Sequence, residues 1–371
     1  MPARLIASQL RTCLGDGAET FAALLAGRSG IGPLRHGEPT ALNVAHGYHV
    51  EDGATRAFAA SRWVADCARR AIADCGLDPR RRRMVALVGT GLRELAAVEA
   101  YATGGAAFPA HRLHFGDAVR AAVPGLHEVV TVSNACSAGG HVLALAEDLL
   151  MLGEADAVLV CGVDAATESM LAMIGRVADH PTDAVRPFDA DRQGVLLGDG
   201  AVAAVLMPDD HAGPALARIV ATGLSCDAHH ETAPAVPGIA RAMRDALARG
   251  GRDPAEVDLV VAHGTGTALN DPAESEAIRQ VLVAGGGDPL VTAVKGATGH
   301  TSGAAALVNV DVAWRCLAGG RVPPVVGLRR PLPEGAGLRF ATTATASTPR
   351  LVQCDAFGFG GVNAVTLVEA P

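Results

Sequence analysis

The chain has 371 residues, a net charge of −8, and 3% aromatic against 49% hydrophobic residues. An acidic chain with so few aromatic rings has neither the basic patches nor the stacking platforms of a nucleic-acid-binding protein, so that class is excluded. No apolar run approaches the roughly 18 residues of a membrane span. Without a leader-like start or closely paired cysteines, we expect a soluble cytoplasmic protein with no membrane partner.

Strand-like runs alternate with alanine-rich helical segments. The runs at 84–88, 128–132 and 157–161 are rich in β-branched residues, and helical patterns cover 58–75 and 140–152. Short buried strands separated by helices are typical of an α/β fold with a largely parallel sheet.

The order of these segments occurs twice: a strand with a glycine turn, a strand and turn leading into a helix, then a third strand. The two sets lie at residues 84–91, 129–136 and 157–162, and at residues 258–266, 290–300 and 351–360. Chance alternation could produce the same pattern. We interpret it as a duplication, with halves 1–211 and 212–371 packed as one body and their reactive turns meeting at a pseudo-twofold centre.

Cys136 is the first candidate for chemistry. It lies among small residues, between a strand and an apolar helix. The positive end of a helix dipole favours a thiolate, so we predict a lowered pKa and a nucleophile at this turn. A buried structural cysteine is the alternative, and it is the better interpretation for cysteines inside strand or helix patterns, namely Cys67, Cys75, Cys161 and Cys316.

Two histidines and one lysine are the next candidates. His263 follows a predicted strand, and His300 opens a helix five residues after Lys295, the only lysine among 31 basic residues. A helix start and a nearby ammonium both disfavour imidazolium, so we predict that His300 is neutral and can donate one hydrogen bond to a developing oxyanion. Taken singly, each histidine is more often a hydrogen-bonded structural residue than a catalyst.

The sequence has no complete motif for binding a dinucleotide, calcium or zinc. The turn at Gly89–Gly91 lacks the third glycine of a dinucleotide-binding turn, because Glu94 stands there. The calcium-like segment that begins at Asp189 has Gly200 where the bidentate glutamate is needed, and no His/Cys spacing fits zinc. We therefore expect neither a metal nor a cofactor.

Together these motifs resemble the β-ketoacyl-ACP synthases of the two-histidine type (KAS I/II-like ketosynthases) in the thiolase-fold superfamily. The motifs are the Ala-Cys-Ser turn, the His-Gly-Thr-Gly-Thr loop, and the segment 295–300, in family order. The resemblance runs from residues 24–31 to residues 357–363. It implies a thiolase fold with duplicated α/β halves in αβαβα layers, the nucleophilic cysteine in the first half and both histidines in the second.

The resemblance also implies decarboxylative condensation of an acyl group with malonyl-ACP, in fatty-acid or polyketide biosynthesis, with substrates carried on phosphopantetheine. Cys136 would hold the acyl group, and His263 and His300 would stabilise the enolate. The N–H groups of Cys136 and Phe359 would form an oxyanion hole, with Phe359 also a gate. Lys295 would hold His300, and Glu274 and Asp271 would support this network. Thr265 and Thr267 would bind the pantetheine arm.

Partners follow from the same resemblance. An acyl carrier protein would dock, and Arg56 and Arg62 are candidate contacts for its acidic surface. We expect a homodimer, with a heterodimer containing a ketosynthase-like subunit as the alternative. Two other functions stay open: acyl transfer to an alcohol or amine, and a chain-length-factor-like subunit, which usually lacks the nucleophile.

The chain also departs from the family pattern. It is shortened, mainly between residues 91 and 133 and between residues 168 and 187. Gln193 stands where an acidic residue is usual, Asp355 where asparagine is usual, and Gly296 where serine or alanine is commoner. None of these departures removes a predicted catalytic group.

Overall fold

The computed structural model describes residues 2–52, 56–176, 178 and 180–371. Within them, one mixed sheet of 12 strands runs through the molecule. Its strands in the first half are β1 (Ala3–Thr12), β2 (Gly15–Asp16), β5 (Met84–Thr90), β6 (Glu128–Ser133), β7 (Ala157–Asp164) and β8 (Gly200–Pro208). Those in the second half are β9 (Ala217–Cys226), β10 (Leu259–Val261), β11 (Leu290–Thr292), β13 (Arg339–Phe340), β15 (Leu351–Gly358) and β16 (Val362–Glu369).

The helices, and two small hairpins of short strands, complete the described structure. The helices are α1 (Gly17–Leu25), α2 (Pro39–Leu42), α3 (Ala59–Cys75), α4 (Leu95–Ala102), α5 (Gly116–Ala122), α6 (Ala138–Met151), α7 (Glu168–Arg176), α8 (Val236–Gly250), α9 (Asn270–Ile278), α10 (Lys295–Thr298) and α11 (Ala305–Gly319). The small hairpins pair β3 (Gly32–Pro33) with β4 (His46–Gly47), and β12 (Arg321–Val322) with β14 (Thr345–Ala346).

The strand order confirms the predicted duplication. The first half runs β6-β5-β7-β8-β1 and the second runs β11-β10-β15-β16-β9, so these ten strands correspond in pairs, while β2 and β13 stand outside the repeat. The two halves join where three residues of β1 pair with three of β9. The predicted boundary at residues 211 and 212 falls in the loop between β8 and β9, and it stays a prediction.

The sheet is less parallel than we predicted. Pairing is parallel in β6-β5-β7 and in β13-β11-β10-β15, but antiparallel through the middle strands of both halves. One reason is local: only three residues connect β15 to β16, and so short a connection allows only a hairpin. The predicted parallel motif therefore holds only for the strands that carry the repeated turns.

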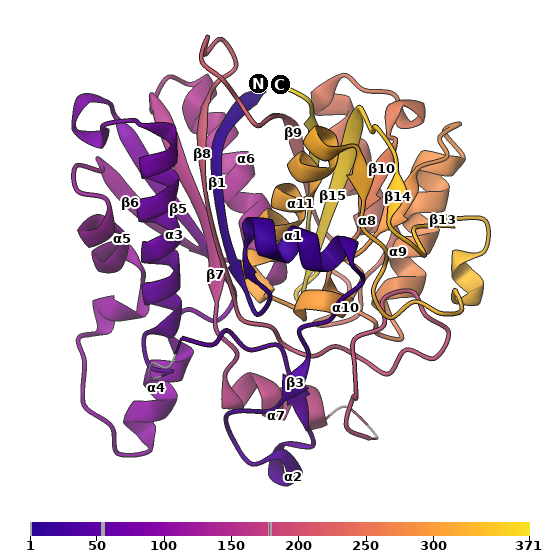
Figure 1. Cartoon of the computed structure of the whole chain (residues 1–371), viewed down its shortest axis with the longest axis horizontal. Coiled ribbons are helices and arrows are strands. Elements are labelled where there is room, and N and C mark those ends of the chain that lie inside the picture. Colours follow the sequence, from indigo (N-terminus) through magenta and orange to yellow (C-terminus); the bar gives the residue numbers. More distant parts are fainter. Residues whose placement is uncertain (1, 53–55, 177, 179) are drawn as a thin grey trace.

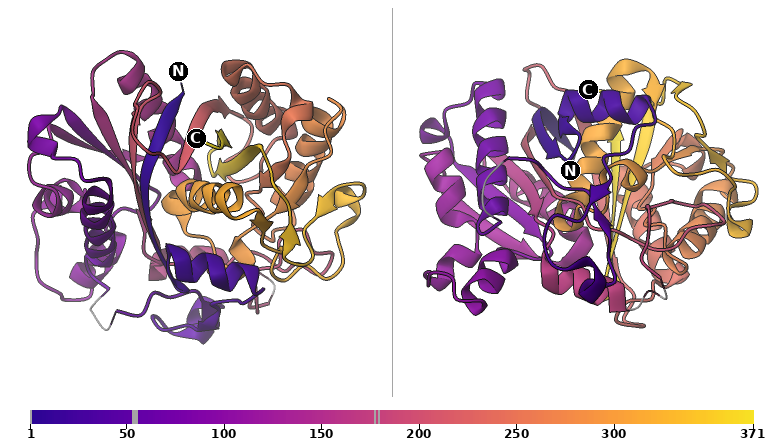
Figure 2. Two further views of the ribbon diagram at one scale, coloured as in Figure 1. Left: turned by 45° about the horizontal axis from the view of Figure 1, so that its top comes forward. Right: turned by 60° about the horizontal axis from the view of Figure 1, so that its bottom comes forward.

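Helices form three layers around the two halves of the sheet (Figure 1). Helices α3 and α5 cover the outer face of the first half, α6 and α11 lie between the halves, and α8 and α9 cover the outer face of the second half. Each layer packs against the sheet through its own cluster of buried side chains, which are mainly Ala, Val and Leu. The arrangement matches the predicted αβαβα order, and the views in Figure 2 keep most of the two halves on opposite sides of the molecule.

Helix α3 shows how the sequence specifies these layers. Its buried residues Ala60, Val64, Cys67 and Ala71 recur every three or four positions and face the sheet. The helix ends at Gly76, whose φ of 66° is readily adopted only without a side chain.

A buried carboxyl lies in the middle layer. Glu147 of α6 accepts a hydrogen bond from the Thr222 N–H at 3.2 Å, while its Oε1 has no partner among the described residues. Burial raises the pKa of Glu147 to about 7. The folded protein therefore prefers the protonated form of this side chain.

Glu147→Gln is expected to reduce the loss of stability at alkaline pH. The pKa of Glu147 rises from its ordinary value of 4.5 to about 7, so its favourable contribution is present at acidic pH and is lost as pH rises through about 7. That loss amounts to about 3 kcal/mol, which the variant should not show. Urea unfolding at about pH 5 and about pH 8.5 measures it. The exposed Glu154→Gln serves as control, and equal pH dependence in all three proteins would contradict the prediction.

Candidate active site

Cys136 lies in the turn that connects β6 to α6. The turn is a short 3₁₀ segment, Ala135–Ser137, in which Ala135 has a φ of 48°. A left-handed conformation is costly for a residue with a side chain, so the surrounding structure must enforce it. The turn places the Cys136 thiol, only 8% exposed, at the start of the helix in the middle layer.

The prediction of a lowered thiol pKa is wrong. Burial raises the pKa of Cys136 to about 11, although the Lys295 ammonium and nearby main-chain N–H groups act in the opposite direction. Loss of water around the sulfur therefore outweighs the favourable field at the helix start. The resting side chain is a neutral thiol, and its proton must leave when the sulfur attacks.

Two main-chain N–H groups are directed at the Cys136 sulfur. They belong to Cys136 itself and to Phe359, in the tight turn between β15 and β16. Gly358 allows the close approach, since a Cβ there would lie 3.0 Å from the Val362 side chain and 3.3 Å from the Cys136 nitrogen. The pair matches the predicted oxyanion hole in position.

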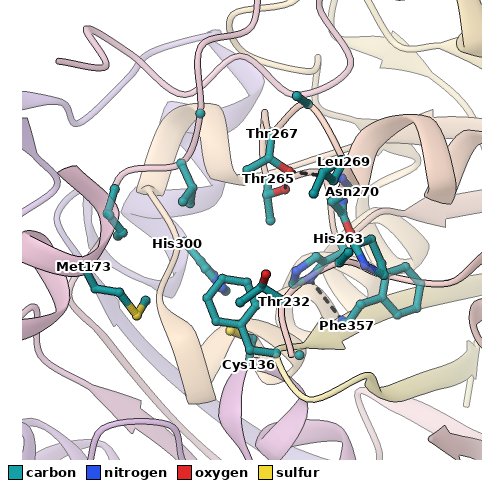
Figure 3. Close-up of a pocket in the computed structure, with 18 of the residues that line it drawn as sticks. Cys136, Met173, Thr232, His263, Thr265, Thr267, Leu269, Asn270, His300 and Phe357 are labelled. Atoms are coloured by element: carbon teal, nitrogen blue, oxygen red, sulfur yellow. Dashed lines mark hydrogen bonds between the residues drawn. The ribbon is translucent and has the colours of Figure 1, made fainter. Parts of the chain in front are cut away.

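His263 and His300 face the same cavity as Cys136 (Figure 3). Their rings are perpendicular, with centroids 5.4 Å apart. Burial, with the charge of Lys295 adding to it, holds the pKa of each ring well below its ordinary value. Both shifts favour a neutral ring, the state predicted for His300, and the catalytic roles of the two histidines stay predictions.

The hydrogen bonds of His263 fix its tautomer. Its Nδ1 accepts the Phe357 N–H at 3.3 Å, the contact drawn in Figure 3. An accepting Nδ1 leaves the proton of the neutral ring on Nε2. The His300 main chain is held by hydrogen bonds with Leu196 and Gly198, while its buried Nδ1 has no partner among the described residues.

Lys295 contacts His263 instead of the predicted His300. Its buried Nζ donates to the His263 carbonyl oxygen and lies 3.3 Å from Nδ1 of the same ring. The Lys295 Nζ contacts are with His263, and the buried Nδ1 of His300 has no hydrogen-bond partner among the described residues. The prediction remains correct for the field, because the ammonium lowers the pKa of both histidines.

Glu274 and Asp271 of α9 hold the loop that carries His263. Glu274 accepts the N–H groups of His263 at 2.6 Å and Gly264 at 2.8 Å. Asp271 accepts the N–H groups of Thr265 at 3.1 Å and of Phe188 at 2.7 Å. Both carboxyls are fully buried and support the loop from behind, outside the cavity lining.

The cavity has a volume of about 430 Å³, within the usual range for small-molecule sites. Six predicted residues line it: Cys136, His263, Thr265, Thr267, His300 and Phe359. The sequence did not reveal its apolar wall, formed by Met170, Met173 and Ile174 of α7 with Leu197 and Leu269. The 3.6-residue spacing of the α7 residues was the available signal, but it does not separate a cavity wall from core.

The two arginines suggested as contacts for a carrier protein do not line the cavity. Arg56 forms a two-pronged ion pair with buried Asp199, at 2.8 and 2.9 Å, and also donates to the Ala166 carbonyl. Because this guanidinium is already bound inside the protein, Arg56 is not supported as a contact for a carrier. Arg62 is more exposed and lies 3.9 Å from Asp52, and its docking role stays a prediction.

The described part of the chain contains neither a cluster of metal ligands nor a membrane-spanning helix. No group of three or more His, Cys, Asp or Glu side chains is placed to hold a metal ion. In the same residues, no helix is long and apolar enough to cross a membrane.

Comparisons with known proteins agree with this geometry. The model of the β-ketoacyl synthase N-terminal domain matches residues 5–212, and that of the C-terminal domain matches residues 216–329. Nodulation protein E of Rhizobium leguminosarum bv. trifolii is 37% identical over 246 residues, covering 64% of this chain and 60% of that protein. The 3-oxoacyl-acyl-carrier-protein synthase 2 of Vibrio cholerae is 35% identical over 251 residues, covering 63% and 60%.

The chain thus spans about 60% of the length of these curated relatives. A solved structure, the ishigamide ketosynthase/chain length factor, is 30% identical with a TM-score of 0.90 and covers 100% of this chain and 99% of its own. This likeness along the whole chain confirms the predicted thiolase fold.

Proposed function

Because the chain belongs to the β-ketoacyl synthase family, we propose that it condenses a cysteine-bound acyl group with a malonyl unit, with loss of carbon dioxide. One observation carries the proposal. A thiol faced by two N–H donors and two neutral histidines meet in one cavity of about 430 Å³. A nucleophile with two separate sets of oxyanion donors suits a reaction in which two oxyanions form in turn.

The first step loads Cys136. Its sulfur attacks the thioester carbonyl of an acyl group on a carrier phosphopantetheine, and the N–H groups of Cys136 and Phe359 stabilise the oxyanion. The new S–C bond forms, the old thioester S–C bond breaks, and the carrier leaves as a thiol with the Cys136 proton. Since the resting thiol is neutral, attack and proton loss must be concerted or closely spaced.

The second step uses the histidines. Nε2–H of His263 and a ring N–H of His300 donate to the thioester carbonyl of malonyl carrier protein. The bond to the carboxylate breaks, carbon dioxide leaves, and the electron pair forms an enolate that the two donors stabilise. The enolate carbon bonds to the acyl carbon, Cys136 leaves as thiolate, and it takes a proton from water.

Other residues would guide the substrate. Thr265 and Thr267 line the cavity with their hydroxyl groups 2.9 Å apart, which suits the amide groups of a pantetheine arm. Phe359 lines the cavity and is 45% exposed, which suits a gate at its mouth. The apolar wall of α7 suits an apolar acyl chain.

An acyl carrier protein is the partner that this reaction requires. We also propose a second ketosynthase-like chain, either an identical copy or a different subunit. Strand β6 ends the sheet of the described residues with one unpaired edge, and such an edge is a template for pairing. Native mass spectrometry distinguishes monomer, homodimer and complex with another subunit.

The proposal is tested by two successive incubations of the wild-type protein. An acyl carrier protein should first leave an acyl adduct visible by intact-mass spectrometry, and malonyl carrier protein should then discharge it as a β-ketoacyl product. Cys226→Ala is the control, since Cys226 is an exposed cysteine that could react adventitiously. No adduct would overturn the nucleophile. An adduct that only an alcohol or amine discharges would indicate acyl transfer, and malonyl decarboxylation without an adduct would indicate a chain-length-factor-like subunit.

Lys295→Met is expected to slow decarboxylation by roughly 10-fold or more, because the variant loses the charge and the hydrogen bonds to His263. Without the ammonium the histidine pKa values rise, so the acid limb of the pH profile should move to higher pH. Lys295→Arg keeps the charge but puts a larger fork into a fully buried site, and should also slow decarboxylation more than acylation of Cys136. Carbon dioxide release at several pH values measures both effects, and a wild-type profile in both variants would contradict them.

A further inference from the structure

A third carboxyl lies behind the two histidines and has no role in the steps above. Asp355 of β15 is fully buried. Its Oδ1 accepts a hydrogen bond from Gln353 Nε2 at 2.9 Å, while its buried Oδ2 has no partner among the described donors. A carboxylate oxygen without a donor is costly at such depth, so protonation of this oxygen requires consideration.

The neighbour of Asp355 across the interior is Glu274. The two carboxyls lie within hydrogen-bonding reach of each other. Glu274 already accepts three N–H donors, from His263, Gly264 and the Asn270 side chain. A carboxylate has about four acceptor positions, so one position of Glu274 is left for a donor, and Asp355 supplies one only if it carries a proton.

The charges around Asp355 do not favour an ionised carboxylate there in addition to those of Glu274 and Asp271. The fully buried Lys295 is the cation facing this cluster, and the positive charge acting on Asp271 is that of Arg192. Burial first, and then the charge of Glu274, raise the pKa of Asp355 well above its ordinary value.

The other titratable side chains around Asp355 bring no further positive charge. His263, Cys136 and Cys354 are neutral near pH 7, because burial lowers the imidazole pKa and raises those of both thiols. The charge of Lys295 acts on both Glu274 and Asp355, so one ammonium is shared between two carboxyls.

We propose that Asp355 is a protonated positioning residue whose Oδ2–H donates to the Glu274 carboxylate. This hydrogen bond joins β15 to the helix that holds the His263 loop. Asp355 and Phe357 point to the same face of β15, since side chains alternate along a strand. Phe357 supplies the N–H bound by His263 Nδ1, and Phe359 supplies an N–H to the Cys136 sulfur. The hydrogen bond made by the Asp355 proton therefore keeps the His263 ring and the Phe359 N–H in their positions at the active site.

The inference rests on the proposed function only in its consequence for activity. Loss of the Asp355 proton at high pH would place two carboxylates against each other in a dry interior, and the repulsion would move Phe357 and Phe359. Condensation should then have an alkaline limb to which Asp355 contributes. Lys295 contributes another, because burial lowers its pKa to about 8.

Infrared spectroscopy tests the protonation without any need for activity. The wild-type protein near pH 7 should show the C=O band of a protonated carboxylic acid that Asp355→Asn lacks. Glu147→Gln should remove a different contribution, and the exposed Glu154→Gln should remove none. If the wild type and Asp355→Asn differ only in carboxylate bands, the proposal is overturned whatever the enzyme does. If the acid band is present and no condensation occurs, the proposed function fails instead.

The activity arm compares a variant that keeps a donor with one that has none. The amide of Asp355→Asn can donate to Glu274 without titrating, whereas Asp355→Leu has no donor. We expect decarboxylation to be about tenfold or more faster in the asparagine variant than in the leucine variant, with an alkaline limb at higher pH than in the wild type. Equal rates in the two variants would contradict the positioning role. If Asp355→Leu does not fold, the infrared bands still decide.

Discussion

A Cys136→Ala variant is expected to take no acyl group from a carrier protein while still releasing carbon dioxide from malonyl carrier protein. Removal of a nucleophile commonly costs about 10⁴-fold or more in the step that needs it. Decarboxylation depends instead on the histidine pair, whose hydrogen bonds run to Phe357, Lys295 and the main chain and do not include the Cys136 sulfur. The variant should therefore separate the two half-reactions.

The measurement combines intact-mass spectrometry for the adduct with carbon dioxide release for decarboxylation. Cys136→Ser is the matched variant, since its hydroxyl has nearly the same shape but is a weaker nucleophile than a thiol. Cys161→Ala, at a buried cysteine of β7 outside the cavity, controls for general loss of a buried sulfur. An acyl adduct that persists on Cys136→Ala would place the nucleophile elsewhere.

The local features of the fold were predictable because short stretches of sequence determine them. The runs around 84–88 and 157–161 are buried along their whole length, so their unbroken apolar character survives in β5 and β7. The turn at Cys136 was predictable for the same reason, since a run of small residues between strand and helix is visible without tertiary structure. The repeated order then gave the strand correspondence between the halves.

Features that depend on distant residues were not predictable. Arg56 pairs with Asp199, 143 positions away, and no local pattern reveals such a pair. The thiol pKa of Cys136 was predicted in the wrong direction because the helix start is visible in the sequence while the depth of burial is not. The position of Lys295 followed from sequence spacing, but its partner did not, because His263 lies 32 positions away along the chain.

His263→Ala and His300→Ala are each expected to slow decarboxylation by about 10²- to 10³-fold, the usual effect of removing one donor from an oxyanion site. Acylation of Cys136 should fall far less, because the donors for that oxyanion are the N–H groups of Cys136 and Phe359. His229→Ala, at an exposed histidine outside the cavity, is the control. Equal losses in both half-reactions would show that the histidines serve acyl transfer itself, and would favour the acyltransferase alternative.

The two histidine variants should also differ from each other. The His263 ring is held by the Phe357 N–H and by Lys295, so its Nε2–H is fixed before substrate arrives. The His300 ring lacks a hydrogen bond at Nδ1 from the described residues, so part of its order must come from the substrate. A donor fixed in advance contributes more to transition-state stabilisation than one that must be ordered on binding. We therefore expect the larger fall in kcat for His263→Ala, and for His300→Ala a loss shared between kcat and KM.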